Sequence, residues 1–263
     1  EPRQDARVQI LLAMTATGYR GGQEQTQPIL FDRAANIMVR VAAFYYASRN
    51  DFFDKRILFQ LPQLIAPGED WVIRHITLVV IGLEQGANPL VLNLLLGALA
   101  DPDPKIRTGA AVGMTKIEGP RSREALRGRL EDEDGLVRGA AAGALLYRVV
   151  MRMDEPADVV ERVRAADDET RRGAAAVLGQ LVATSGAVPG ETERDREEVQ
   201  AWVLALADEF DPAECAWVRL RARTLVHLGR AGEAAAVLRS ALDRFPGDPD
   251  LLLQRSIVAE ASE

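Results

Sequence analysis

The chain of 263 residues is 48% hydrophobic but only 5% aromatic and contains 21 glycines, a composition that favours close packing of helices and disfavours a β-rich fold. Its formal net charge of -7 argues against a dominant nucleic-acid surface, because neutralising phosphates needs clustered Lys and Arg. The single cysteine excludes an intramolecular disulfide framework and a metal site built from several cysteines.

No apolar run is long enough for a membrane span, which needs roughly 18 residues or more. The longest candidates are Ile76–Leu83 and Pro89–Ala100. We therefore expect a soluble chain without a membrane span. The chain begins at Glu1 rather than Met, which indicates processing or trimming, so cytoplasmic and extracytoplasmic locations both stay open.

Residues 1–66 are predicted to form an N-terminal helical cap that matches neither of the repeat types found further along the chain. Helical periodicity covers Val8–Tyr19, Ile29–Ser48 and Phe53–Leu64. Arg20–Gly22 is the predicted break between the first two helices.

This cap is rich in aromatic residues: seven of the chain's eleven Phe and Tyr residues lie between Phe31 and Phe59. One interpretation is that Phe44, Phe52 and Phe59 plug the exposed end of a repeat array. The other is that aromatic side chains form a docking patch for a protein partner, since such residues dominate interface hot spots. The candidate partner-binding residues are then Tyr45, Tyr46, Phe52 and Phe53.

An alanine-rich phrase recurs three times in the middle of the chain, each time after an acidic turn. The copies are Lys105–Ala111, Leu136–Ala142 and Arg171–Ala176. Their aligned arginines are 31 and then 34 residues apart. Self-similarity at this period predicts an architecture of stacked units that bury their apolar faces against their neighbours.

Each copy is part of a predicted helical hairpin. In the clearest one, Ala125–Leu130 is a short helix, Glu131–Gly135 is a turn with capping residues, and Leu136–Val150 is a second helix. A fourth, degenerate copy contains Trp71–Arg74, with its arginine 33 residues before that of the next copy. Residues 67–184 are therefore predicted to be a repeat region.

The acidic turn, the β-branched residue, the arginine and the Ala-rich helix together resemble HEAT repeats, specifically the short phycobilisome-lyase type. The resemblance implies a ladder of hydrogen bonds between repeats, made by Asp101 with Arg107 and by Asp132 with Arg138. It also implies an α-solenoid.

The two flanking copies differ from this pattern at the acidic turn position. The aligned residue is Gly68 in the first copy and Ala166 in the last, where Asp167 comes one residue later. The ladder is therefore expected at the two central pairs.

Residues 185–263 are predicted to form a different unit, beginning with the loop Ser185–Gly190. Residues 192–209 are expected to be a bridging helix, followed by helices Trp217–Leu228, Glu233–Phe245 and Asp248–Ala261. The spacing of small and helix-stop residues here resembles a tetratricopeptide unit. The residues that carry this resemblance are Ala222, Gly229, Ala234, Leu238, Ala241 and Pro246.

Candidate catalytic groups are few, and each has a structural interpretation. His75 and His227 are the only imidazoles, and their neighbours in sequence form no metal motif. Cys215 has no nearby histidine and is expected to be inert. Arg219, Arg221 and Arg223 alternate on one predicted helix and are interpreted as a salt-bridged, solvated face rather than an anion site.

The sequence therefore predicts an all-α protein, an α-solenoid of HEAT-like hairpins followed by a tetratricopeptide-like unit. The predicted function is a non-enzymatic protein–protein interaction scaffold or an accessory subunit of a larger complex, with no cofactor, no metal and no nucleic acid. The resemblance leaves a chromophore-handling, lyase-like role as the alternative. Binding of nucleic acid by a stripe of Arg74, Arg107, Arg138 and Arg172 is the weaker alternative, because the ladder already uses these positions.

Overall fold

The computed structural model describes residues 2–50, 55–86, 88–153, 156–184, 193–210 and 215–260. All regular structure within these ranges is helical, which confirms the predicted all-α class. The chain divides into two compact units, Glu1–Ala125 (unit 1) and Leu126–Glu263 (unit 2), which are described separately. The expected domain boundaries after residues 66 and 184 stay predictions.

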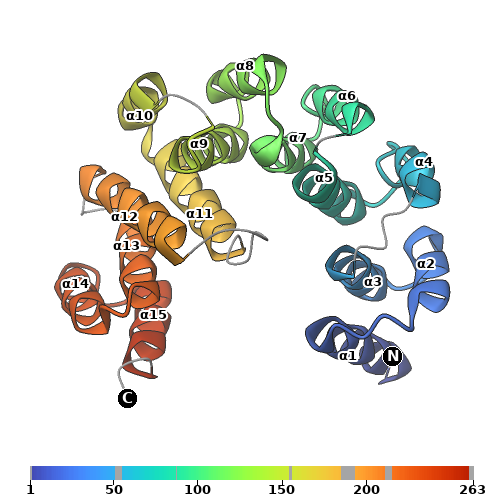
Figure 1. The fold of residues 1–263 in the computed structure, drawn as a ribbon, viewed down its shortest axis with the longest axis horizontal. Coiled ribbons are helices and arrows are strands. Elements are labelled where there is room, and N and C mark those ends of the chain that lie inside the picture. The colour runs from blue at the N-terminus through green and yellow to red at the C-terminus, as the bar shows by residue number, and fades with distance from the viewer. Residues whose placement is uncertain are drawn as a thin grey trace. The chain divides into compact units, whose positions relative to one another are not determined.

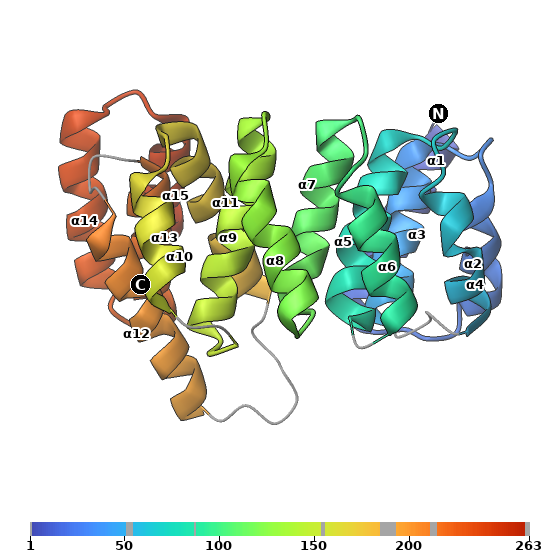
Figure 2. The same cartoon turned by 90° about the horizontal axis from the view of Figure 1, so that it is seen from above.

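Unit 1 has two layers of helices (Figure 1). In the first layer each helix packs on the next, in the order α1, α3, α5, α7, while α2, α4 and α6 form the second layer. Figure 2 shows these helices running side by side along their lengths. The elements are α1 (Pro2–Thr17), α2 (Gln23–Phe31), α3 (Ile37–Arg49), α4 (Lys55–Leu64), α5 (Trp71–Gln85), α6 (Pro89–Ala98), α7 (Pro104–Gly113) and the 3-10 turn η1 (Met114–Lys116). Helix α8 (Pro120–Gly128) contains the division between the units.

Unit 2 repeats the same alternation of layers. Helices α9, α11, α13 and α15 pack on one another in that order, and α10, α12 and α14 cover them on the second side. The elements are the 3-10 turn η2 (Arg129–Glu131), α9 (Gly135–Val150), α10 (Pro156–Ala165), α11 (Asp168–Thr184), α12 (Glu193–Glu209), α13 (Cys215–His227), α14 (Ala231–Arg244) and α15 (Pro249–Glu260). In both units the expected stacking of helical hairpins is therefore observed.

Short polar side chains start many of these helices, because an Asp or Asn oxygen can accept one of the free main-chain N–H groups of the first turn. The observed caps, each with the residue whose main-chain N–H donates to it, are Asn36 with Met38, Asp70 with Val72, Asn88 with Leu90, Asp103 with Lys105 and Asp134 with Leu136. The acidic turns of the repeat phrase are thus helix N-caps, as the sequence predicts.

The single helix expected over Ile29–Ser48 is wrong, because the structure has two helices there. Helix α2 ends at Phe31 and α3 begins at Ile37. The carboxylate of Asp32 accepts the N–H of Ala34 at 3.0 Å, and Asn36 caps α3. Local hydrogen bonds from Asp and Asn side chains compete with helix continuation and create this turn.

Several glycines of the first-layer helices, two of them in the repeat phrase, lie where neighbouring helices approach closely. A Cβ atom added to Gly82 on α5 would be 2.1 Å from the carbonyl oxygen of Gly113 on α7. In unit 2, a Cβ on Gly139 of α9 would lie 2.7 Å from the Cα of Gly173 on α11. Both distances are shorter than van der Waals contact, so these glycines allow the backbones to pack together.

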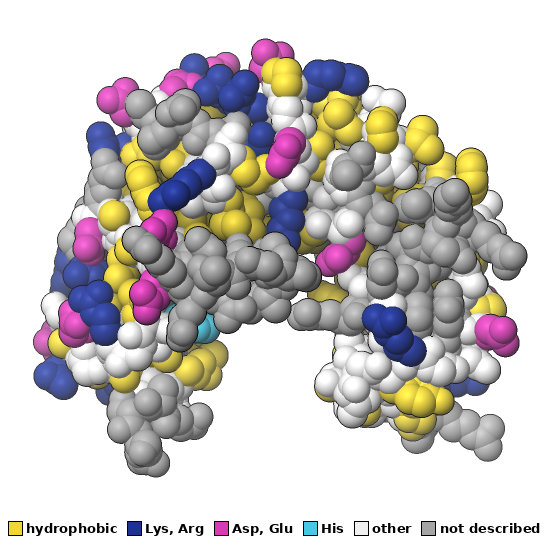
Figure 3. All heavy atoms as spheres, in the orientation of Figure 1, with side chains coloured by type: hydrophobic (Ala, Val, Ile, Leu, Met, Phe, Trp, Pro, Cys, Tyr) yellow, Lys and Arg dark blue, Asp and Glu magenta, His cyan; other side chains and the backbone are white. Residues whose placement is uncertain are grey.

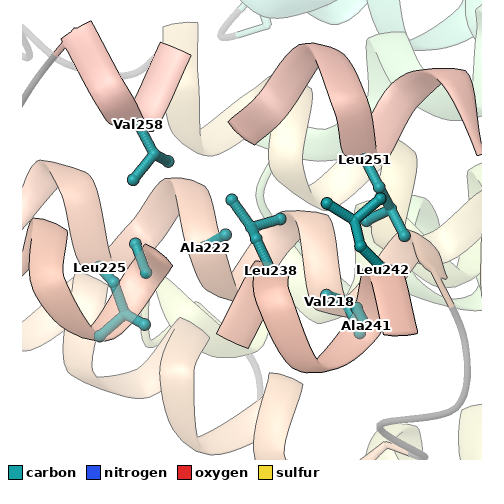
Figure 4. Close-up of a cluster of buried hydrophobic side chains, with 9 residues drawn as sticks. Val218, Ala222, Leu225, Leu238, Ala241, Leu242, Leu251 and Val258 are labelled. Carbon is teal, nitrogen blue, oxygen red and sulfur yellow. The ribbon is translucent and has the colours of Figure 1, made fainter. Parts of the chain in front are cut away.

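The C-terminal part of unit 2 has its own apolar core between α13, α14 and α15 (Figure 4). Ala222, Leu238 and Leu251 are fully buried in it. Both α13 and α14 contribute alanines as well as larger aliphatic side chains, which pack together with the aliphatic side chains of α15. The other members are Val218, Leu225, Ala234, Ala241, Leu242 and Val258.

Candidate protein-binding surfaces

The predicted ladder residues of unit 1 are close together, but the carboxylate has a different partner from the one expected. The guanidinium of Arg107 donates to the main-chain oxygen of Asp101 at 3.0 Å and to that of Pro102 at 3.2 Å. The carboxylate of Asp101 accepts a hydrogen bond from Arg74 of the preceding hairpin. Arg74 also donates to the carbonyl of Ile65 at 3.0 Å. The degenerate first copy therefore takes part in the ladder.

Unit 2 shows the same pattern of partners, in which an arginine bonds the main chain of its own turn and the carboxylate of the next hairpin. Arg138 donates to the main-chain oxygen of Asp132 at 2.9 Å, while its second nitrogen donates to the Asp167 carboxylate at 2.8 Å. The Asp132 carboxylate instead lies 3.2 Å from Arg129. In the last copy Arg171, not the aligned Arg172, donates to the turn carbonyl of Ala166. Each ladder arginine described here thus connects its own hairpin turn to a helix of the first layer.

The carboxylate of Asp167 has a second function as a helix cap. It accepts the main-chain N–H of Thr170 at 2.8 Å, in addition to the contact with Arg138. These interactions, with the Thr170 main-chain hydrogen bond as the largest, hold the pKa of Asp167 below its ordinary value.

A further ladder position, Arg40 on α3, was missed by sequence reasoning. Arg40 donates to the carbonyl of Leu30 at 3.2 and 2.9 Å and to both carboxylate oxygens of Glu69 at 2.8 and 2.9 Å. Its hydrogen bonds lower the pKa of Glu69 against the opposing effect of burial. The signal was present as Val39–Ala43, which reads valine, arginine, valine and two alanines, with Arg40 34 residues before Arg74.

The predicted aromatic patch is wrong at Tyr46. This side chain is fully buried, and its hydroxyl donates to the carbonyl of Tyr19 at 2.6 Å and accepts the N–H of Gly22 at 3.0 Å. Tyr46 is therefore a core residue that fixes the turn between α1 and α2. Two other members of the patch, Phe52 and Phe53, lie outside the described residues.

Tyr45 lies on the exposed side of α3. It is 48% exposed, and Met38, seven residues earlier on the same helix face, is 56% exposed. The alternative role of end plug fits Phe44, which is fully buried, but is wrong for Phe59, which is 79% exposed. Tyr45 with Met38 thus remains as a small apolar stripe on α3.

A second apolar surface, the α4–α6 surface, lies on the second layer of unit 1. We define it by Phe59 on α4 and by Leu90 and Leu94 on α6. Phe59 is 79% exposed and Leu90 is 61% exposed, while Leu94 is half-buried. Figure 3 shows hydrophobic side chains gathered over these two helices. Helix α6 contains no charged residue along its ten positions.

Unit 2 has a groove lined by α11, α13 and α15, with a volume of about 250 Å³. Its α11 wall consists of small residues, and Leu253 on α15 is 62% exposed beside it. The lining residues are Ala175, Ala176, Gly179, Ala216, Arg219, Leu220, Arg223, Asp250, Leu253 and Gln254.

Two of the three alternating arginines on α13 form ion pairs, as the sequence predicts. Arg219 pairs with Asp250 of α15, and Arg221 lies 3.0 Å from Asp208 of α12. The third, Arg223, is half-buried in the groove and has no hydrogen bond or ion pair with any residue that the structure describes. The interpretation of a salt-bridged face is therefore wrong for Arg223.

The other titratable candidates have structural surroundings. The Nδ1 atom of His75 lies 2.7 Å from the carbonyl oxygen of Lys105. Burial, followed by a hydrogen bond to Asp248, raises the pKa of the Cys215 thiol. Within the described ranges no group of three or more His, Cys, Asp or Glu side chains could hold a metal ion. No helix within those ranges is both long and apolar enough to cross a bilayer.

Comparison with known families identifies both repeat types. Residues 60–146 match the family model for HEAT repeats, and residues 216–258 match the model for a tetratricopeptide repeat. The phycobilisome-lyase subtype stays a prediction. No curated protein matches the sequence at a significant level. HEAT and tetratricopeptide repeats typically form protein-interaction scaffolds.

Proposed function

We propose that this chain of HEAT repeats and a tetratricopeptide unit is a non-enzymatic accessory subunit of a protein complex, docked through the α4–α6 surface. The observation that carries the proposal is the absence of charge on α6, a helix of the second layer whose Leu90 is 61% exposed. An exposed helix normally presents charged and polar residues to water on one face.

Helix α10 provides the comparison, because it has the same position in the second layer of unit 2. It carries Asp158, Glu161, Arg162 and Arg164 within ten residues. The uncharged composition of α6 is thus no general requirement of this layer. Large exposed apolar patches on soluble proteins mark interaction sites.

The energetic argument is that a partner would remove these side chains from water. Covering a fully exposed Leu or Phe side chain contributes about 1.5–3 kcal/mol each. Phe59 and Leu90 together are therefore large enough to be hot spots, although association also costs translational and side-chain freedom. A stable subunit interface would combine them with neighbouring contacts.

We further propose that Tyr45, with Met38 beside it, is a secondary contact on α3. An aromatic residue with an apolar neighbour one helical repeat away is suited to a shallow protein contact. Phe52 and Phe53 of the original patch stay candidates for the same contact, without any structural description.

The test is affinity capture of the tagged full-length chain from its native source. The variant Phe59→Asp with Leu90→Asp should lose its stoichiometric partner, since two charges would be desolvated at the interface. Leu136→Asp is the matched control, because Leu136 is 60% exposed on α9 in unit 2. The control should retain the partner.

Circular dichroism spectra and thermal midpoints should be the same for the double variant, the control and the native chain. Retention of all partners by the folded double variant would contradict the α4–α6 proposal. Failure of the native chain to capture any stoichiometric partner would contradict the subunit role itself. Tyr45→Ala alone should weaken the capture without abolishing it.

A further inference from the structure

The unpaired Arg223 is the most informative group in the groove of unit 2. Its neighbours on α13 are satisfied by carboxylates of α15 and α12, so that acidic residues are available around this helix. Arg223 is nevertheless half-buried and has no hydrogen-bonding partner among the described residues. A partly desolvated guanidinium is stabilised by an anion, which forms stronger, charge-assisted hydrogen bonds with it.

Gln254 provides a second, independent observation in the same groove. Only 8% of its surface is exposed, and its amide forms no hydrogen bond within the described part of the chain. Neither amide atom of Gln254 is among the fully buried side-chain atoms without a partner, so the amide is accessible from the groove that Gln254 lines. An amide can donate to a carbonyl and accept from an N–H, which are the groups of a peptide main chain.

The walls of the groove leave space for an extended segment. A Cβ atom added to Gly179 on α11 would lie 3.3 Å from Leu220 and 4.0 Å from the Nη1 atom of Arg223. The missing side chain at Gly179 therefore keeps the approach to the guanidinium open. Leu253 provides an exposed apolar contact at the α15 wall.

We propose that this groove binds an acidic, extended segment of a protein partner. The guanidinium of Arg223 holds a carboxylate of the segment, the amide of Gln254 pairs with its main chain, and Leu253 packs against an apolar side chain next to the acid. The charge of the lining residues fits this occupant, because Arg219 is balanced by Asp250 and Arg223 supplies one net positive charge. This site is separate from the α4–α6 surface and does not depend on it.

A nucleic acid fits the groove less well. Binding to a phosphate backbone requires several cations along the strand, whereas Arg223 is the single unpaired cation among the described lining residues. The exposed Leu253 and the small α11 residues match a protein side chain instead of a sugar–phosphate chain.

The experiment is selection of a random dodecapeptide phage library on the immobilised full-length chain. We expect enrichment of sequences with Asp or Glu adjacent to an apolar residue. Arg223→Gln should abolish this enrichment and weaken a selected peptide about tenfold in fluorescence anisotropy, as expected when a charge-assisted hydrogen bond is lost. Arg239→Gln is the matched control, because Arg239 is exposed on α14 and does not line the groove.

Gln254→Leu should weaken the same peptide while leaving its acidic preference unchanged, because it removes the amide and keeps Arg223. Replacing the selected peptide's acids by amides should weaken it as much as Arg223→Gln does. Any one of four results would overturn the proposal: enrichment of neutral peptides, equal losses of affinity in both arginine variants, absence of any enrichment, or tighter binding of a ten-nucleotide oligo-dT. None of these results depends on Phe59 or Leu90, so the subunit role is tested separately.

Discussion

The Arg40–Glu69 pair of unit 1 and the Arg138–Asp167 pair of unit 2 join the same kinds of group but have very different surroundings. In both, an arginine of the first helix layer donates to a main-chain carbonyl that precedes its own helix and to a carboxylate of the next hairpin. The side chains are 3% and 4% exposed in unit 1, but 20% and 53% exposed in unit 2. One sequence phrase therefore produces a buried ion pair in unit 1 and a more exposed ion pair in unit 2, and their effects on stability should differ.

The difference follows from solvation. A charge that loses its partner in a buried site stays desolvated, whereas an exposed charge is rehydrated by water. Removal of one partner of the unit 1 pair should therefore destabilise the unit strongly, even though the intact pair adds little net stability. The pair in unit 2 should be close to neutral.

Glu69→Ala is expected to have the largest effect. It leaves Arg40 buried with only the Leu30 carbonyl as a described partner, and breaking a buried pair in this way costs about 3–5 kcal/mol. Urea unfolding followed by circular dichroism measures the loss. The double variant Arg40→Met with Glu69→Leu is the control and should recover most of it. Equal losses in both variants would show that packing, not the unpaired charge, causes the effect.

Lowering the pH should also reduce the free energy of unfolding through the Glu69 carboxylate, by less than Glu69→Ala does. The hydrogen bonds from Arg40 are the main cause that lowers the pKa of Glu69 in the folded state. The contribution of this carboxylate to stability is therefore complete above the ordinary pKa of 4.5, and it is lost as the pH falls through the folded-state pKa. The stability gap between the native chain and Glu69→Gln should therefore narrow below pH 4.5. A gap that stays constant down to pH 3 would contradict the pairing.

The repeat phrase made most of the helices of the middle region predictable. An acidic cap, an arginine and small residues at helical spacing determine where a helix begins and which face it packs. Arg40 could have been found by the same rule, but its phrase follows the turn at Asp32 and Asn36 that the apolar periodicity concealed. The carboxylate partner of each arginine belongs to the next hairpin, and only the folded structure places it.

The binding surfaces were less predictable because they depend on helix phase and tertiary pairing. Tyr45 and Tyr46 are adjacent on a helix and so point about 100° apart, which means that both could not share one exposed face. The structure buries Tyr46 and exposes Tyr45. Arg223 was indistinguishable from Arg219 in sequence, since its lack of a carboxylate partner follows from where α15 packs.

Asp167→Asn should have the smallest effect and completes the comparison. The amide oxygen can still accept the N–H of Thr170, so the cap survives while the charge facing Arg138 is lost. Because this carboxylate is 53% exposed, we expect a loss below about 1 kcal/mol in urea unfolding. Asp167→Ala should cost about 0.5–2 kcal/mol more, since it also removes the cap. If Asp167→Asn destabilised the chain as much as Glu69→Ala, burial would not decide the strength of these pairs.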